Sequence, residues 1–186
     1  MRIISGKYRG HHLVSFQADH IRPTTDRVKE SQFNILMGYI EGAKVLDLFS
    51  GTGNLGLEAL SRGAAEVTFV EKSKQSLAIL QKNLEKLKVS EPYKIVQKDV
   101  LSFLKTYSGE PFDVIFADPP FTEKMAHDVM LATSAAVAED RVFAPGAVMT
   151  IESGGKEKIE DIYPTLERYD VREFGDKTLS FYRRKT

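Results

Sequence analysis

From Lys44 to the C-terminus, hydrophobic and polar positions follow two alternating patterns. Short β-prone apolar runs alternate with amphipathic stretches of helical period, the pattern of parallel strands covered by helices. The predicted strands are residues 44–49, 67–70, 93–96, 112–117 and 147–151. The predicted helices run from 54 to about 63, from Ser73 onward, and over 125–137. Two last β-prone runs, 168–174 and 178–183, predict a hairpin that completes a seven-stranded sheet.

The first forty residues have a different pattern, which we interpret as an N-terminal extension, 1–40, before a main domain, 41–186. Residues 1–5 and 11–16 are short β-prone runs, and they predict a hairpin with basic residues near its tip. A turn at 22–25 follows, with a threonine placed to cap a helix over about 26–40.

Composition narrows the class of protein. The chain has 186 residues, 42% of them hydrophobic and 28% charged, which fits one globular domain. It has no cysteine, which excludes disulfides and thiolate metal sites and suits a reducing compartment. The N-terminus lacks the apolar segment of a signal peptide, and no apolar run approaches the roughly 20 residues of a membrane span. We therefore expect a cytoplasmic protein.

Charge gives a weaker indication. The 26 basic and 26 acidic residues cancel, so the net charge does not indicate a nucleic-acid partner. Both ends of the chain are basic, but solvated termini often are, so this pattern alone does not identify a binding surface. The four histidines are scattered without metal-ligand spacing, and no metal is expected.

Acidic residues stand at the ends of four successive predicted strands: Asp47, Glu71, Asp99 and Asp118. Residues 51–56 also match the G-x-G-x-x-G pattern of dinucleotide sites, with Glu71 placed as the ribose-binding acid. The pyrophosphate of NAD is negatively charged, so nearby carboxylates would repel it. S-adenosylmethionine has no phosphate, and its ribose diol, ammonium and sulfonium are groups that carboxylates attract. Glu71 can accept hydrogen bonds from the ribose, and Asp99 from the adenine amine. The acids therefore favour S-adenosylmethionine.

The predicted cofactor-binding residues lie at the ends of these strands and in the turns that follow them. They are Asp47, Phe49, Ser50, Gly51, Thr52, Gly53, Asn54, Leu55, Glu71, Lys72, Asp99, Val100 and Asp118.

Asp118, Pro119, Pro120 and Phe121 are the candidate catalytic residues. Two prolines fix φ twice and remove two N–H donors, so the segment presents carbonyl oxygens and one carboxylate. Such a rim suits the exocyclic amine of a nucleobase, whose hydrogens Asp118 and the Pro119 carbonyl would accept while Phe121 stacks on the base. A base in a duplex would first have to be flipped out. The alternative is that Asp-Pro-Pro is only a turn after a buried strand.

Several segments resemble a known family. Residues 45–53 and 118–121 look like motifs I and IV of amino-methyltransferases that use S-adenosylmethionine. The chain also resembles the bacterial small-subunit ribosomal RNA guanine-N2 methyltransferases, the RsmD family, most specifically in residues 2–10, 22–30, 33–36 and 177–184. This similarity covers nearly the whole chain. The resemblance implies a Rossmann-like class I methyltransferase fold and methylation of one guanine in 16S ribosomal RNA, within an assembled or assembling small subunit. A monomer is expected.

The resemblance also implies RNA contacts by the N-terminal hairpin and by the block that begins at residue 22. The predicted RNA-binding residues are Arg2, Lys7, Arg9, Arg22, Thr24 and Arg27. For Thr24 and its neighbour Thr25, capping of the following helix is an equal alternative.

Three other functions stay open at this point. A DNA adenine-N6 methyltransferase would share both motifs. An NAD-dependent oxidoreductase would share the glycine pattern, although the acids disfavour it. A non-catalytic RNA-binding assembly protein would keep the fold without needing an intact segment 118–121.

Overall fold

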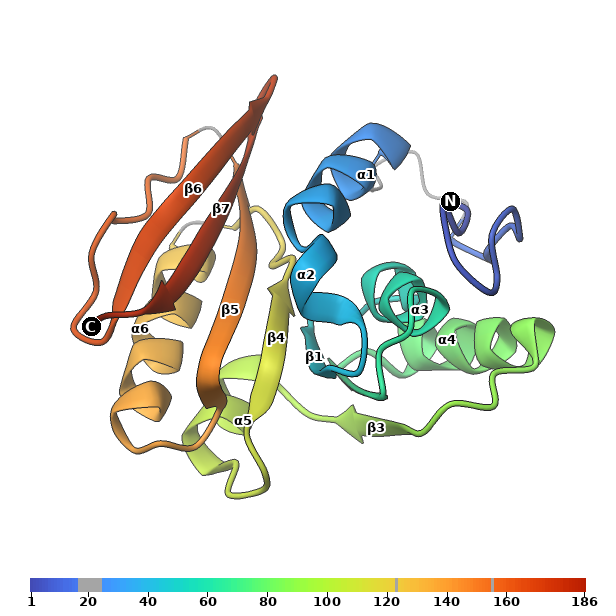
Figure 1. Ribbon diagram of the computed structural model, residues 1–186, viewed down its shortest axis with the longest axis horizontal. Helices are drawn as coiled ribbons and strands as arrows, with labels where there is room; N and C mark the ends of the chain where they lie inside the picture. The colour runs from blue at the N-terminus through green and yellow to red at the C-terminus, as the bar shows by residue number, and fades with distance from the viewer. Residues whose placement is uncertain (17–24, 123, 155) are drawn as a thin grey trace.

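A computed structural model of the chain describes residues 1–16, 25–122, 124–154 and 156–186, and it shows one seven-stranded sheet with helices on both faces (Figure 1). The strand order is β3-β2-β1-β4-β5-β7-β6. Strands β1 to β5 are parallel, and β7 pairs antiparallel with both β5 and β6. The predicted mostly parallel sheet that ends in a hairpin is confirmed.

The strands are β1 (Lys44–Leu48), β2 (Glu66–Glu71), β3 (Tyr93–Gln97), β4 (Phe112–Ala117), β5 (Phe143–Gly154), β6 (Leu166–Phe174) and β7 (Lys177–Arg184). The helices are α1 (Asp26–Ile35), α2 (Met37–Ile40), α3 (Asn54–Ser61), α4 (Lys74–Leu87), α5 (Val100–Thr106) and α6 (Met125–Ala138).

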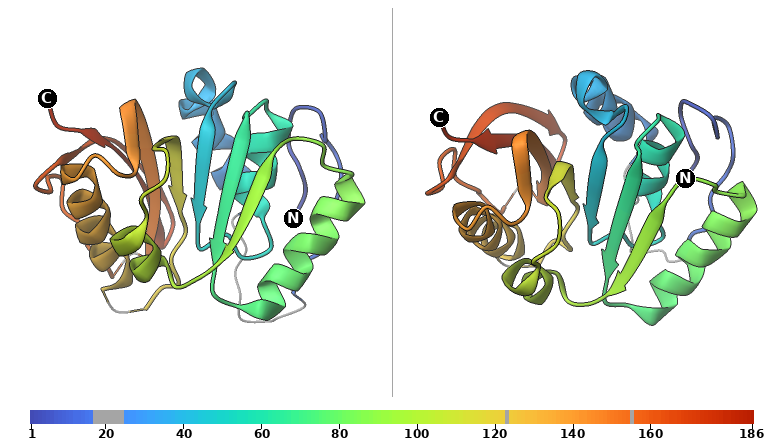
Figure 2. Two further views of the ribbon diagram at one scale, coloured as in Figure 1. Left: turned by 90° about the horizontal axis from the view of Figure 1, so that it is seen from below. Right: turned by 60° about the horizontal axis from the view of Figure 1, so that its bottom comes forward.

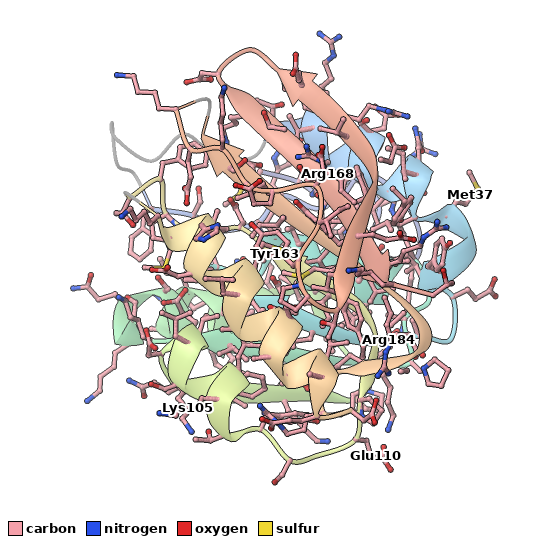
Figure 3. The ribbon with its side chains drawn as sticks, turned by 90° about the vertical axis from the view of Figure 1, so that its left-hand side faces the viewer. Met37, Lys105, Glu110, Tyr163, Arg168 and Arg184 are labelled. Carbon is pink, nitrogen blue, oxygen red and sulfur yellow. The ribbon has the colours of Figure 1, made fainter. Side chains whose placement is uncertain are left out.

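Two hydrophobic clusters fill the space between the sheet and its helices. Successive side chains of a strand point to opposite faces, so Val45 belongs to one cluster and Leu46 to the other. The first cluster joins the sheet to α1, α3, α4 and the N-terminal segment, and the second joins it to α5 and α6. Figure 2 shows these two layers on either side of the strands. Figure 3 shows α6 from outside, with Tyr163 beside it.

The expected helix over 26–40 is two helices. The Oγ1 of Thr25 caps α1 by accepting from the N–H of Val28. Helix capping is one of the two roles that the sequence suggests for Thr24 and Thr25. Helical geometry then breaks at Leu36, which has φ −89° and ψ 8° and is fully buried. The apolar spacing continues past this point, which is why the sequence pattern does not reveal the break.

One further helix and one strand, α5 and β5, differ from the sequence prediction. Helix α5 was not predicted, because a helix of seven residues is too short to display a clear period. Strand β5 is longer than residues 147–151 and begins at Phe143. The register between β4 and β5 shifts between Phe112 and Val114, so Pro145 and Gly146 lie in an irregular part of the strand.

The N-terminal segment, residues 1–16, has no regular strands, but its two arms pair as a short irregular hairpin around the antiparallel bridge between Arg2 and His12. The backbone hydrogen bonds between the arms run from Ile3 to His11, from Gly10 to Ile3 and from Leu13 to Met1. Its backbone is also held by α3, because the buried carboxylate of Glu58 accepts from the N–H groups of Ile4 and Ser5. Ile3, Tyr8 and Leu13 also enter the first hydrophobic cluster. Sequence periodicity could not show that a helix also donates or accepts hydrogen bonds along this segment.

None of the helices in the described ranges is long and apolar enough to cross a membrane.

Candidate active site

The candidate site lies at the carboxyl ends of β1, β2 and β4. Leu48, the last residue of β1, pairs with Val70 of β2 and with Ala117 of β4. Glu71 follows Val70 and ends β2, and Asp118 directly follows Ala117 at the end of β4. These two acids therefore lie on the two sides of the turn that follows β1. Ligands of open α/β sheets bind at this edge.

The turn after β1 depends on left-handed backbone at three positions: Phe49 with φ 59°, Gly51 with φ 55° and Gly53 with φ 94°. Phe49 is the unexpected member, since residues other than glycine rarely adopt this conformation, and such strain concentrates at functional sites. A Cβ at Gly51 would meet only the Phe49 carbonyl oxygen, at 3.9 Å, so the space beside this glycine is open. The turn is therefore shaped to leave room for a ligand.

Gly53 and Gly56 serve packing. A Cβ on Gly53 would lie 2.4 Å from Cδ1 of Leu80, and one on Gly56 would lie 2.3 Å from Cε1 of Phe69. Both glycines let α3 approach its neighbours closely. The glycine pattern thus reflects helix packing at two positions and an open backbone at Gly51.

Asp47 lies at the centre of the acid group and is only 1% exposed. Its Oδ2 accepts from the N–H of Gly56 at 2.8 Å. Burial raises the pKa of Asp47 to about 8, against the lowering effect of that hydrogen bond, and the charges of Asp118 and Glu71 raise the pKa further. The predicted convergence of these three acids is therefore seen in the structure.

Glu71 connects two turns of the site. Its Oε2 accepts from the N–H of Gly51 at 3.0 Å, and its Oε1 accepts from the N–H of Ser73 at 2.8 Å. Each carboxylate oxygen has a second lone pair, so Glu71 keeps the capacity to accept from a ligand diol. Its neighbour Lys72 is exposed.

Asp99 caps α5, since its Oδ2 accepts from the N–H of Ser102 at 3.0 Å. It lies beyond β3, one strand further from β1 than Glu71, and it is exposed. The following residue, Val100, is buried in the second hydrophobic cluster. A cap thus explains the presence of Asp99, and its side chain is exposed to solvent.

The remaining predicted cofactor residues lie in or beside the turn. Ser50 has a buried Oγ without a hydrogen-bond partner among the described residues. The Thr52 carbonyl accepts from Asn83, Asn54 accepts from Lys29, and Leu55 is buried. A buried hydroxyl that lacks a partner costs free energy unless a ligand satisfies it. Together with the open Gly51 and the acids, it fits a cationic, hydroxyl-rich cofactor.

The segment from Asp118 to Phe121 extends from β4 as a rigid lip. The Asp118 N–H donates to the carbonyl of Leu48 at 3.5 Å, which holds the segment against β1. Pro119 is buried, and the Pro120 carbonyl accepts from the N–H of Thr122 at 2.7 Å. Phe121 presents a side chain that is 51% exposed.

A cavity of about 950 Å³ adjoins the lip, with Phe121 in its wall. Its other lining residues come from the residue that follows the lip, the start of α6, the end of β5 and the chain after it, and the turn between β6 and β7. They carry both signs of charge and are Thr122, Lys124, His127, Gly154, Lys156, Glu157, Lys158, Glu160 and Asp176. Ligand pockets commonly have this size. The sequence did not indicate that these distant segments meet beside Phe121.

The predicted RNA-binding residues have different surroundings. Arg2 forms an ion pair with Asp26 at 2.8 Å. Lys7 pairs with Glu91 at 2.7 Å, while Arg9 is exposed. Arg27 lines a groove of about 360 Å³ between the start of α1 and the turn of the β6–β7 hairpin. Arg22 and Thr24 lie outside the described residues.

Metal ligands do not gather in this site: within the described ranges, there is no group of three or more histidine, aspartate and glutamate side chains that could hold a metal ion.

Solved structures with this fold place the protein in a class. A candidate methyltransferase from Escherichia coli superimposes with a TM-score of 0.85 and 32% identity, over 100% of this chain and 98% of the other. A candidate methylase from Haemophilus influenzae gives a TM-score of 0.79 and 37% identity, over 97% and 96% of the two chains. With the turn after β1 and the lip after β4, this likeness makes the protein a methyltransferase of the Rossmann-like class.

The family can also be stated. The chain belongs to the family described as conserved hypothetical protein 95, the RsmD family, whose model matches residues 1–183. A curated relative from Haemophilus influenzae, named ribosomal RNA small subunit methyltransferase D, is 42% identical over 155 residues, or 82% of this chain and 78% of the relative. The Escherichia coli protein of the same name is 37% identical over 166 residues, or 89% and 79% of the two chains.

Proposed function

We propose that this protein transfers a methyl group from S-adenosylmethionine to the exocyclic N2 amine of a guanine in 16S ribosomal RNA. The names of the curated relatives support an RNA of the small ribosomal subunit as substrate. The observation that carries the chemistry is the donor-poor lip from Asp118 to Phe121 beside the buried acids of β1 and β2.

The residues of the glycine turn and its flanking acids are suited to hold the cofactor. The Oγ of Ser50 and the open side of Gly51 would meet its amino-acid part, Glu71 would accept from the ribose hydroxyls, and Asp99 would accept from the adenine amine. When bound, S-adenosylmethionine supplies a methyl group on a positively charged sulfur. Nearby carboxylates stabilise that charge through Coulomb attraction.

Asp118 and Pro119 would act on the target amine. The lone pair of an exocyclic amine is delocalised into the ring, so the amine is a poor nucleophile. The Asp118 carboxylate and the Pro119 carbonyl accept its two hydrogens and direct the nitrogen toward the methyl carbon. The N–C bond forms as the bond between sulfur and the methyl carbon breaks, and the surplus amine proton leaves to Asp118 or to water.

Phe121 and the cavity beside it would receive the base. The target guanine has to be unpaired or flipped out of a duplex, which costs a few kcal/mol. Stacking on an aromatic ring returns about 1–3 kcal/mol per base. The exposed Arg9 and Arg27, with the lysines among the residues that line the cavity, would contact phosphates as the RNA crosses the surface.

Replacing Asp118 by alanine tests this function directly. We expect D118A to lose methyl transfer to small-subunit particles by about 100-fold or more, the effect of removing one preorganised polar group, with cofactor affinity largely kept. The measurement is labelled methyl transfer to particles from cells that lack the enzyme, with nucleoside mass spectrometry to locate the methyl group on guanine N2.

Asp128, an exposed carboxylate in the first turn of α6, provides the matched control, and D128A should retain full turnover. Unchanged turnover in D118A would exclude the proposed role. Methyl transfer to adenine in duplex DNA, without transfer to the particles, would support the adenine-N6 alternative instead.

A further inference from the structure

The ring of Phe121 rests on a support made by two strands of the sheet. A Cβ built on Gly154, the last residue of β5, would lie 3.3 Å from Cγ of Phe121. The Nζ of Lys177, the first residue of β7, lies 5.1 Å from the centre of the same ring, within cation–π range. Gly154 and Lys177 are register partners across β5 and β7. The support is therefore built into the strand pairing.

A buried carboxylate holds the cation of this support. Glu152 and Lys177 are 4% and 9% exposed, and Oε1 of Glu152 lies 2.5 Å from Nζ of Lys177. Most ion pairs of the described chain lie at the surface, whereas this pair lies at the end of the sheet that carries the active-site lip. The carboxylate fixes an ammonium that would otherwise rotate freely on a four-carbon side chain.

Stability alone gives little reason for such a pair. Removing two charges from water costs free energy that their mutual attraction seldom exceeds, so a buried ion pair is weak evidence for a stabilising role. What the pair does have is a position over Phe121, since its ammonium lies over the ring. The ring as a whole remains half exposed, so it keeps surface available for a partner beside the cavity.

We propose that Lys177 and Glu152 are positioning residues, which hold the ring of Phe121 on Gly154 so that its free surface stacks on the flipped target base. This inference rests on the proposed function, because it assigns the support to the base-binding part of the same site. A ring that is already ordered loses less conformational entropy when a base stacks on it, so binding is stronger.

A tryptophan in place of Phe121 makes the support observable, since the chain has no tryptophan of its own. We expect the emission of F121W to be quenched when an RNA fragment with an unpaired guanine binds. In the F121W/K177M/E152Q variant, acrylamide should reach the indole more readily, and quenching by the RNA should require about tenfold more fragment. Replacing both partners avoids leaving one buried charge unpaired.

Methyl-transfer kinetics supply the second readout. The K177M/E152Q variant should raise KM for the small-subunit particle about tenfold and leave the affinity for S-adenosylmethionine unchanged. The K177R variant keeps a cation over the ring, so its KM for the particle should stay close to that of the wild type. The matched control is K94M, which breaks the surface pair between Lys94 and Glu66 and should change neither readout.

Different results separate the two proposals. If wild-type protein methylates the particle and K177M/E152Q does so with the same KM and the same indole accessibility, the positioning role is overturned. If wild-type protein transfers no methyl group to the particle, the proposed function fails. The acrylamide measurement needs no substrate, so unchanged indole accessibility would still overturn the support of the ring.

Discussion

The acid at the end of β1 links cofactor binding to protonation. Because burial raises the pKa of Asp47 to about 8, this carboxyl group is largely protonated at neutral pH, although its Oδ2 accepts from Gly56. A cationic ligand beside it favours the ionised form and lowers the pKa again. Binding of a positively charged cofactor should therefore release part of a proton.

We accordingly expect S-adenosylmethionine binding near pH 7 to release protons, and its affinity to rise as the pH increases toward about 8, where Asp47 ionises without help. Calorimetric titrations in buffers with different ionisation enthalpies count the released protons. The D47N variant retains an acceptor for the Gly56 N–H and should release fewer. Equal proton release by wild type and D47N would show that Asp47 does not titrate with binding.

Gly56 offers a second test at the level of one residue. A methyl group there would lie 2.3 Å from Phe69 and 2.9 Å from Oδ2 of Asp47, so α3 would have to move away from the sheet. We expect G56A to lower the free energy of unfolding by about 1–3 kcal/mol. Gly38 of α2 is the control, because a Cβ there meets nothing within 4 Å, and G38A should stabilise by about 0.5–1 kcal/mol. Urea denaturation measures both changes.

At the level of elements, one buried lysine joins α1, α3 and the N-terminal segment. Nζ of Lys29 lies 3.0 Å from Oε2 of Glu58 and donates to Oδ1 of Asn54 at 2.9 Å and to the carbonyl of Arg2 at 2.5 Å. Burial lowers the pKa of Lys29, while Glu58 acts in the opposite direction. Because Asn54 begins α3 directly after the cofactor turn, this lysine connects the turn to the N-terminal segment.

Removing that lysine should loosen three elements together. We expect K29M to cost about 3 kcal/mol of unfolding free energy, since it leaves the buried Glu58 with Arg62 as its remaining cationic partner among the described residues. Early proteolytic cleavage in the N-terminal segment should accompany the loss. K94M, at an exposed pair, should cost less than about 1 kcal/mol. A melting curve of K29M that matches K94M would contradict this role.

At the scale of the whole molecule, the sequence predicts those features of the fold that follow from the local spacing of apolar residues. The alternation of apolar runs and amphipathic stretches gave the parallel sheet, the closing hairpin and the helices around it, and the acids at strand ends converge because parallel strands end at one edge. Contacts between distant segments were not predictable in this way. The anchoring of the N-terminal segment on Glu58 and the support of Phe121 by Lys177 depend on which strands become neighbours.

The outermost strands, β3 and β6, have a consequence for assembly. In the sheet order β3 has a strand neighbour on one side only, and its free edge is where sheets from two molecules could join. The outer edge of β6 is partly covered, because Ile162 bridges to Glu167 and the N–H of Arg168 donates to the carbonyl of Asp161. Both strands carry charged side chains: Lys94 on β3, and Arg168, Asp170 and Arg172 on β6 (Figure 3 labels Arg168). Joining two copies edge to edge through these strands would strip water from these charges, which disfavours that mode of association.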